Sequence, residues 1–399
     1  MKEFQLGFGC ETWELKFSED QVVEEFLPNL KVTPAKVMDL VCNALANPVG
    51  YPELKRAITP DDRLAIVMVD KFNGFFEILV SVLRYVLDAG VAMENVTIVC
   101  LAEADSDSWV ENLPDEFNEI KIEIHNPDNK KSHAFLTSDD DIGKLYLNRT
   151  IIEADQVIVM GKRQFDPVFG ISGAESDLYP TFANSEMIAS FSKTNFSDSA
   201  PGSSMGMQQA IKVSWLLGAP YFIQVIEGAN QSVEEIIVGA SEANRFAEKK
   251  LNEIWKRETL KTYEIVIALV GGPGEKIGFA QLCRAVGCAK RIVKKNGVVV
   301  LLAKADLDLE VIKKQLDIKA SGKNEIASSR VSPHLIRQWV EAASENKVFV
   351  STFEGGGDVG RLLAKPLHST GELSKLLSGG KEIAIIRDAH KARIEIRKR

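Results

Sequence analysis

The sequence predicts an α/β protein made of two α/β lobes, each built on a Rossmann-like parallel or mixed sheet, with a cleft between the lobes. Short apolar runs alternate along the chain with segments whose apolar residues recur at helical spacing, which is typical of strands joined by crossover helices. The main apolar runs end in polar or glycine-rich turns. At 399 residues the chain also exceeds what one hydrophobic core usually fills, so two domains are expected.

The first lobe is expected to span residues 1–260. Residues 4–17 alternate polar and apolar side chains and predict a hairpin. Apolar runs at 63–69 and 96–102 flank a helical pattern at 75–87, so they predict a βαβ unit with parallel strands. The other elements expected in this lobe are helices at 34–46, 207–217 and 233–258, strands at 120–125, 144–147, 156–160 and 221–226, and a Ser- and Gly-rich loop at 190–206.

The second lobe is expected to span residues 261–399 and to repeat the same alternation. A buried strand at 264–270 runs into a glycine cluster, and two strands at 382–386 and 392–396 are expected to close the chain as a hairpin that returns to one of the two sheets. The elements expected between them are helices at 279–295 and 333–345 and strands at 297–303 and 347–351.

Composition excludes several classes of protein. The net charge is -8 and no long Lys or Arg run is present, which argues against nucleic-acid binding. No apolar stretch reaches the roughly 18 residues of a membrane helix, and residues 1–17 lack the apolar segment of a signal peptide. The five cysteines form no CxxC pair, so we expect reduced thiols in a cytoplasmic protein.

The loop Gly161–Pro180 (GKRQFDPVFGISGAESDLYP) is the expected ligand site, because open parallel sheets bind ligands at the carboxyl ends of their strands. Other strand ends carry comparable groups. If these strand ends lie next to one another, their acidic and basic side chains face each other across a surface formed by glycines. The alternative for an aspartate after a strand is a plain helix cap. The polar and glycine residues at these strand ends are Asp70, Glu103, Asp105, Lys162, Arg163, Gly271 and Gly272.

Common motifs for nucleotides, metals and nucleophiles are missing. The cluster VGGPGEK lacks the P-loop spacing, and GxGxxG does not occur, although the amides of Gly271 and Gly272 could hold a phosphate or carboxylate at the next helix. The five histidines form no HxxxH or HxH pair, and GxSxG is absent. No metal site is therefore expected. A hard cation on loop aspartates remains an alternative, with Asp105, Asp107, Asp166 and Asp177 as its possible ligands.

Several segments together resemble the lactate racemase family in order and spacing. They are ALANPVGYPEL (Ala44–Leu54), the strand ending at Asp70, HNPD (His125–Asp128), LNRTIIEADQVIVMG (Leu147–Gly161), FGISGAESDLYP (Phe169–Pro180) and VGG (Val270–Gly272). The resemblance implies a two-domain α/β enzyme that uses a nickel pincer nucleotide derived from nicotinic acid. It also implies racemisation or epimerisation of a 2-hydroxy acid, by hydride removal and return with two histidines handling the hydroxyl proton.

Carried over position by position, the resemblance keeps few of the family's functional groups. The two catalytic histidines fall on Asp105 and Asp166, the lysine that anchors the cofactor falls on Ser176, and the nickel-binding histidine falls near Ser192. Of the family's DxTRP turn, the aspartate is retained as Asp70 and the arginine becomes Asn73. Its YQxxK segment corresponds to Ala280, Gln281 and Arg284.

These replacements imply that the family's nickel-pincer chemistry is lost or altered and that no cofactor is expected. Serine has no amine for the covalent attachment, and an aspartate with a pKa near ~3.9 is a poor general acid at neutral pH. One hypothesis is a protein that binds a small 2-hydroxy acid or sugar acid in the cleft, with Asp105 and Asp166 as acid and base if it is active. Lys162, Arg163 and Arg284 would hold the carboxylate.

The binding residues expected under this hypothesis are Asp70, Lys162, Arg163, Ser172, Gly173, Gly271, Gly272, Gln281 and Arg284. The alternative hypothesis is a non-catalytic binding or partner subunit of an active racemase-like paralogue. A homo-oligomer is possible under either hypothesis.

Overall fold

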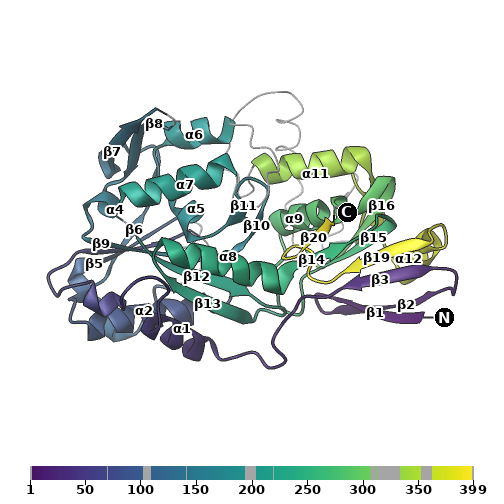
Figure 1. Cartoon of the computed structure of the whole chain (residues 1–399), viewed down its shortest axis with the longest axis horizontal. Coiled ribbons are helices and arrows are strands. Elements are labelled where there is room, and N and C mark those ends of the chain that lie inside the picture. The colour runs from purple at the N-terminus through teal and green to yellow at the C-terminus, as the bar shows by residue number, and fades with distance from the viewer. Residues whose placement is uncertain are drawn as a thin grey trace. The chain divides into compact units, whose positions relative to one another are not determined.

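The computed structural model (Figure 1) describes residues 2–69, 71–101, 109–140, 142–193, 204–218, 220–305, 307, 312, 333–351 and 362–397. Backbone contacts divide the chain into two compact units. The N-terminal unit contains Lys31–Gly228 and Ser232–Leu251, and the C-terminal unit contains Met1–Leu30, Ala229–Gln231 and Asn252–Arg399. The limits 1–260 and 261–399 expected from sequence differ from this division chiefly at the first 30 residues, which lie with the C-terminal unit.

The N-terminal unit is built on a six-stranded sheet in the order β13-β12-β9-β4-β5-β6. The strands are β13 (Val233–Gly239), β12 (Tyr221–Glu227), β9 (Gln156–Lys162), β4 (Leu64–Met68), β5 (Val96–Cys100) and β6 (Lys121–Ile124). All neighbours pair in parallel except β13, which is antiparallel to β12. β4 is buried along its whole length because helices cover both faces of the sheet.

The two faces of this sheet carry separate hydrophobic cores. Leu64, Ile66 and Met68 pack with α1 (Val37–Ala46) and α2 (Phe75–Asp88) on one face. Val67 and its neighbours pack with α5 (Ala174–Leu178) on the other face. The other helices of this unit are α4 (Arg149–Glu153), α6 (Ser185–Lys193), α7 (Met205–Leu216) and most of α8 (Ser241–Trp255), whose last residues belong to the C-terminal unit. The unit also contains the short turns η1 (Leu54–Arg56), η2 (Met93–Asn95), η3 (Asp115–Phe117) and η4 (Lys130–Ser132), and the antiparallel pairs β7 (His133–Asp139) with β8 (Gly143–Asn148) and β10 (Gln164–Asp166) with β11 (Gly170–Ser172).

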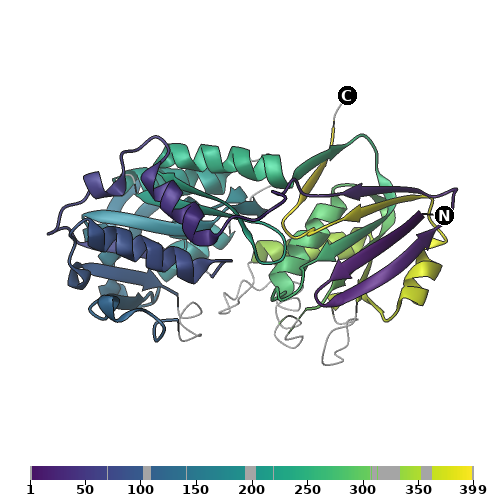
Figure 2. The same cartoon turned by 90° about the horizontal axis from the view of Figure 1, so that it is seen from below.

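The C-terminal unit is built on a second six-stranded sheet, whose paired strands are all parallel, in the order β18-β17-β16-β15-β19-β3. The strands are β18 (Lys365–Leu367), β17 (Lys347–Ser351), β16 (Val293–Ala303), β15 (Tyr263–Val270), β19 (Glu382–Ile386) and β3 (Val22–Phe26). The hairpin of β1 (Lys2–Phe8) and β2 (Glu11–Phe17) and helix α12 (Thr370–Leu377) pack on one face (Figure 2). Helices α9 (Phe279–Lys290) and α11 (Pro333–Glu345) pack on the other, and β14 (Lys256–Thr259) pairs separately with β20 (Arg393–Ile396).

The fold class and the main local elements predicted from sequence are confirmed. Both units are α/β, one with a parallel sheet and one with a mixed sheet. Residues 4–17 lie in the β1–β2 hairpin, and β4, α2 and β5 form the expected parallel βαβ unit. The cleft between lobes stays a prediction.

Two of the predicted elements are wrong. The helix expected at 233–258 begins as β13, because the β-branched run VEEIIVG pairs with β12, and the helix α8 starts only at Ser241. The final hairpin does not form. β19 lies between β15 and β3, and β20 pairs with β14, so the closing strands take partners far away in sequence. In addition, the helix expected at 279–295 ends at Lys290 because β16 begins at Val293.

None of the described helices is both long enough and apolar enough to cross a bilayer.

Candidate functional site

Strand β9 places the start of the Gly161–Pro180 loop in the middle of the N-terminal sheet, because β9 lies between β4 and β12. A Cβ atom at Gly161 would lie 2.6 Å from the Cα atom of Ala174 and 2.4 Å from a carboxylate oxygen of Asp177. Only glycine therefore lets α5 approach the end of β9 this closely. The same loop supplies both the strand end and the helix that packs on it.

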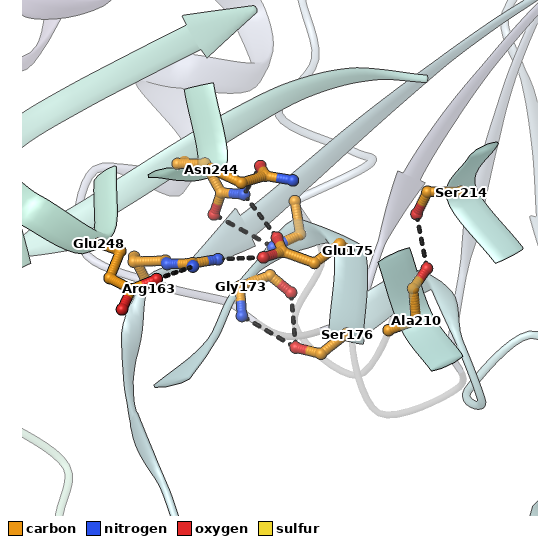
Figure 3. Close-up of polar contacts among 10 residues, drawn as sticks. Arg163, Gly173, Glu175, Ser176, Ala210, Ser214, Asn244 and Glu248 are labelled. Carbon is orange, nitrogen blue, oxygen red and sulfur yellow. Dashed lines mark hydrogen bonds and ion pairs between the residues drawn. The ribbon is translucent and has the colours of Figure 1, made fainter. Parts of the chain in front are cut away.

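A buried polar network joins the end of β9 to α5, β12 and α8 (Figure 3). Arg163 and Glu175 are only 4 % and 1 % exposed, and the Arg163 guanidinium donates to Glu175 Oε1 in a close ion pair. Gln224 Nε2 donates to Glu175 Oε2 at 2.8 Å and to Asn244 Oδ1 at 2.6 Å, and Gln224 Oε1 accepts from the amide of Ala174 at 3.1 Å. The buried charges are thus matched inside the unit, as their desolvation requires.

Arg163 lies between two carboxylates of its own chain. In addition to the ion pair with Glu175, its second terminal nitrogen lies 3.9 Å from Glu248 Oε2. Lys162 differs, because its side chain is 21 % exposed and its ammonium lies 3.6 Å from Glu227 Oε2. Glu227 Oε1 also accepts from the amide of Asn73 at 3.0 Å. Of the two cations at this strand end, Lys162 is the one that reaches solvent.

Asp166, Ser172 and Gly173 lie in the β10–β11 hairpin and at the start of α5, close in sequence to Lys162 and Arg163. Asp166 Oδ1 accepts from the amides of Val168 at 2.8 Å and Phe169 at 3.1 Å, which closes the turn of the hairpin. A Cβ atom at Gly173 would lie 2.5 Å from Arg163 Nη1. The expected site residues Asp70 and Asp105, like Glu103 and Asp107, lie outside the described residues.

The serines at the positions of the family's cofactor lysine and nickel histidine are engaged with backbone. Ser176 is 4 % exposed, and its hydroxyl accepts from the amide of Gly173 and donates to the carbonyl of Gly173, both at 2.8 Å. Ser192 donates to the carbonyl of Ile188 at 2.8 Å within α6. Both hydroxyls therefore act as local supports of short helices.

Aromatic side chains pack beside this loop. Phe169 stacks on Phe191 with ring centroids 5.7 Å apart, and Tyr179 meets the same ring edge-on at 5.7 Å. Burial raises the pKa of Tyr179 to about 12, so the phenol stays neutral at physiological pH. These rings belong to a hydrophobic cluster with Met207 and Val213 of α7.

The remaining expected site residues lie in the C-terminal unit. Gly271 adopts a positive φ of 77°, and the amide of Gly272 donates to Glu275 Oε2 at 2.8 Å. The glycine turn therefore already binds a carboxylate of its own chain. Gln281 Oε1 accepts from the amide of Gly278 at 3.1 Å and caps α9, while Arg284 lies half-buried one turn further along the helix.

A second group of potential ligand side chains, which sequence reasoning missed, lies in the C-terminal unit. Glu275, Asp388 and His390 each bring one possible ligand atom within 4.8 Å of the others. Burial, followed by the nearby Glu275 carboxylate, raises the pKa of Asp388 to about 6 against the opposing charge of Lys391. The only local signal is the two-residue spacing of Asp388 and His390, since Glu275 comes from a different strand end.

The fold and this loop define a two-unit α/β protein whose polar groups cluster at the carboxyl ends of parallel strands. Residues 8–202 match the family described as the lactate racemase N-terminal domain, and this part of the chain belongs to that family. None of the curated proteins matches the sequence.

Solved structures also resemble the chain. The lactate racemase apoprotein from Thermoanaerobacterium thermosaccharolyticum superposes with a TM-score of 0.80 at 16 % identity, covering 99 % of this chain and 100 % of that chain. A protein from Thermotoga maritima, solved by a structural genomics consortium, superposes with a TM-score of 0.62 at 10 % identity, covering 93 % of this chain and 100 % of the other. At such identities these likenesses establish the fold.

Proposed function

We propose that this protein binds a small 2-hydroxy acid or sugar acid on the lactate racemase scaffold and does not perform the family's nickel-pincer racemase or epimerase reaction. Membership of the family supports the class of ligand. We further propose a cytoplasmic location, because all five cysteines are free thiols, as is usual in reducing compartments.

The observation that carries this proposal is the state of Ser176. The resemblance places the cofactor-anchoring lysine at this position, and the pincer nucleotide needs an amine there for its covalent attachment. Ser176 offers a hydroxyl that is buried and already bonded to both backbone polar groups of Gly173. The residues present do not fit the tethered cofactor, so we assign no reaction step to it.

The surroundings of Asp166 support the same conclusion. A residue that replaces a catalytic histidine should present a proton acceptor or donor to a substrate. One oxygen of the Asp166 carboxylate instead accepts from the amides of Val168 and Phe169 and holds the hairpin turn closed. We therefore propose that Asp166 has a structural role and that the protein binds the acid without catalysing a reaction.

For ligand binding we propose Lys162 and Ser172 as the groups of this loop that meet the acid. Lys162 is partly exposed, and its ion pair with Glu227 is longer than a hydrogen bond. The hydroxyl oxygen of Ser172 is buried and has no hydrogen-bond partner among the residues that the structure describes. Arg163 is excluded from this list because Glu175 neutralises it.

A thermal-shift screen tests the binding proposal, with lactate, glycerate, gluconate and galacturonate as probes, each with and without divalent metals. Ligand at about 100 times its Kd stabilises a protein by about 2.7 kcal/mol, so we expect a midpoint rise of several degrees for at least one acid. Lys162→Met should abolish this rise, whereas the exposed Lys121→Met should keep it. If no acid shifts the midpoint, or if both variants respond like the parent, the binding proposal is wrong.

Elemental analysis tests the loss of the cofactor separately. The protein is expressed together with the enzymes that make the pincer nucleotide, and a lactate racemase prepared in the same strain serves as the positive control. We expect nickel far below one atom per chain. Stoichiometric nickel with a covalently bound nucleotide in this protein would overturn the assignment of Ser176.

A partner-subunit function is the second candidate, and the surface of α7 favours it. The apolar side chains of Met205, Ile211, Trp215 and Leu216 on this helix are 56 %, 38 %, 69 % and 42 % exposed. If α7 is an assembly surface, sedimentation will show a complex with a racemase-like paralogue or a homo-oligomer, and Trp215→Glu will dissociate it. If sedimentation shows a monomer both with and without the paralogue, the partner-subunit function is wrong and only the ligand-binding function remains.

A further inference from the structure

The C-terminal unit carries a cluster of three potential metal ligands that is independent of the β9 loop. Glu275 follows β15, and Asp388 and His390 follow β19. β15 and β19 are neighbouring parallel strands, so their carboxyl ends lie side by side at one edge of the sheet (Figure 1). That edge is where open α/β sheets bind ligands.

The geometry and chemistry of these side chains match a small cation. One ligand atom from each residue lies within 4.8 Å of the other two, which brings two carboxylate oxygens and one imidazole nitrogen to a common centre. His390 is 8 % exposed, the side chain of Glu275 is 7 % exposed, and Asp388 is half-buried. The Glu275 carboxylate is also oriented by the Gly272 amide, which donates to its Oε2 atom at 2.8 Å. An outer-shell hydrogen bond of this kind orients a carboxylate that binds a metal.

We propose that Glu275, Asp388 and His390 form a Zn²⁺ site in the C-terminal unit. Zn²⁺ accepts imidazole nitrogen and carboxylate oxygen alike, whereas Mg²⁺ and Ca²⁺ take oxygen ligands. Three protein ligands leave a fourth position for water or for an oxygen of a bound acid. Two carboxylates and a neutral imidazole also match the charge of a divalent ion.

Lys391 is the cation that this metal has to replace. Its ammonium forms a close ion pair with Glu275 Oε1, and both side chains are less than 10 % exposed. The same ammonium lies 5.9 Å from the centre of the Trp255 ring. When Zn²⁺ binds Glu275, the Lys391 ammonium can keep a favourable cation–π contact with Trp255. The buried ammonium is therefore not left without a favourable interaction.

The arrangement makes a directional prediction for two kinds of variant. His390→Ala and Asp388→Asn each remove a ligand and should weaken Zn²⁺ binding by about tenfold or more. Loss of an outer-shell partner already lowers metal affinity by about 10- to 100-fold, and loss of a direct ligand should cost at least as much. Lys391→Met removes the competing positive charge and should tighten binding, by about tenfold. An ordinary structural salt bridge predicts no Zn²⁺ binding in any of these proteins.

The experiment uses the untagged full-length chain after treatment with a chelator, titrated with Zn²⁺ by calorimetry and with Co²⁺ by visible absorption. Co²⁺ in a site with nitrogen and oxygen ligands should give an absorption band that His390→Ala abolishes, and excess Zn²⁺ should displace it. His368→Ala, which changes an exposed histidine of the same unit, is the matched control and should bind like the parent. Melting curves of all variants without metal identify any that fail to fold.

Three results would overturn the site. The first is the absence of Zn²⁺ binding in both the parent and Lys391→Met. The second is equal affinity in the parent, His390→Ala and Asp388→Asn, which would place the bound metal elsewhere. The third is preferential binding of Mg²⁺, unaffected by His390→Ala, which would exclude the imidazole as a ligand.

Discussion

Replacement of Arg163 by methionine will lower the free energy of unfolding of the N-terminal unit by about 3–5 kcal/mol, the usual effect of breaking a buried ion pair from one side. Arg163 and Glu175 are almost completely buried, so the variant leaves the Glu175 carboxylate without its cation and away from water. Gln224 still donates one hydrogen bond to Glu175, which does not balance the charge. Urea denaturation followed by circular dichroism measures the loss.

Two further variants separate the ion pair from other effects of the substitution. Arg163→Met combined with Glu175→Gln removes both charges and keeps an oxygen that accepts from Gln224, so it should recover most of the lost stability. Arg84→Met breaks the exposed ion pair with Glu116, whose partners are 51 % and 40 % exposed, and should cost no more than about 1 kcal/mol. An Arg163→Met variant as stable as Arg84→Met would show that the buried pair contributes nothing.

The elements that sequence predicts correctly are those held together by nearby residues. The strands at 64–68 and 96–100 and the helix between them are predicted directly by apolar runs and helical spacing. Because a crossover helix joins the two strands within one sheet, they are parallel. The hairpin of residues 2–17 follows in the same way from strict alternation. In these segments local pattern and tertiary packing favour the same structure.

The elements that sequence misses depend on partners far along the chain. The run at 233–239 has apolar residues at helical spacing, and only the exposed edge of β12 makes it a strand. β3 is a strand because β19 pairs with it about 360 residues later, and this pairing brings the N-terminal residues into the C-terminal unit. Periodicity within a window contains no information about such partners.

The candidate site shows the same limit. The strand-end position of Lys162 and Arg163 is readable from sequence, but their different environments are not. Arg163 is neutralised by Glu175, a residue of the same loop that the sequence presents as one of several acids. Glu275, Asp388 and His390 meet only because two parallel strands end together. Motif spacing therefore predicts which edge of a sheet carries function and does not predict which charges are already matched.

Acidification from pH 6.5 to pH 4 will destabilise the N-terminal unit through His125, by about 3 kcal/mol at 1.36 kcal/mol per pKa unit. His125 is 6 % exposed, and burial lowers its pKa from 6.5 to about 4 against the opposing effect of the Ala183 carbonyl. The nearby ring of His133, 5.4 Å away, lowers the pKa further, and Glu123 raises it slightly. The unfolded chain therefore binds a proton at this side chain near pH 6.5, where the folded chain does not.

The sign follows from this difference in proton binding. The contribution of neutral His125 to stability is complete above pH 6.5 and disappears as the pH falls toward 4. His125→Phe keeps a ring against Phe182 and removes the titration, so its stability should change less over this interval than that of the parent, by about 3 kcal/mol. Urea denaturation midpoints of both proteins, taken at half-unit pH steps, measure this difference in stability. Because carboxylate protonation affects both proteins alike, its effect cancels when the two are compared. The exposed His368→Gln should follow the parent, and identical pH profiles for the parent and His125→Phe would contradict the prediction.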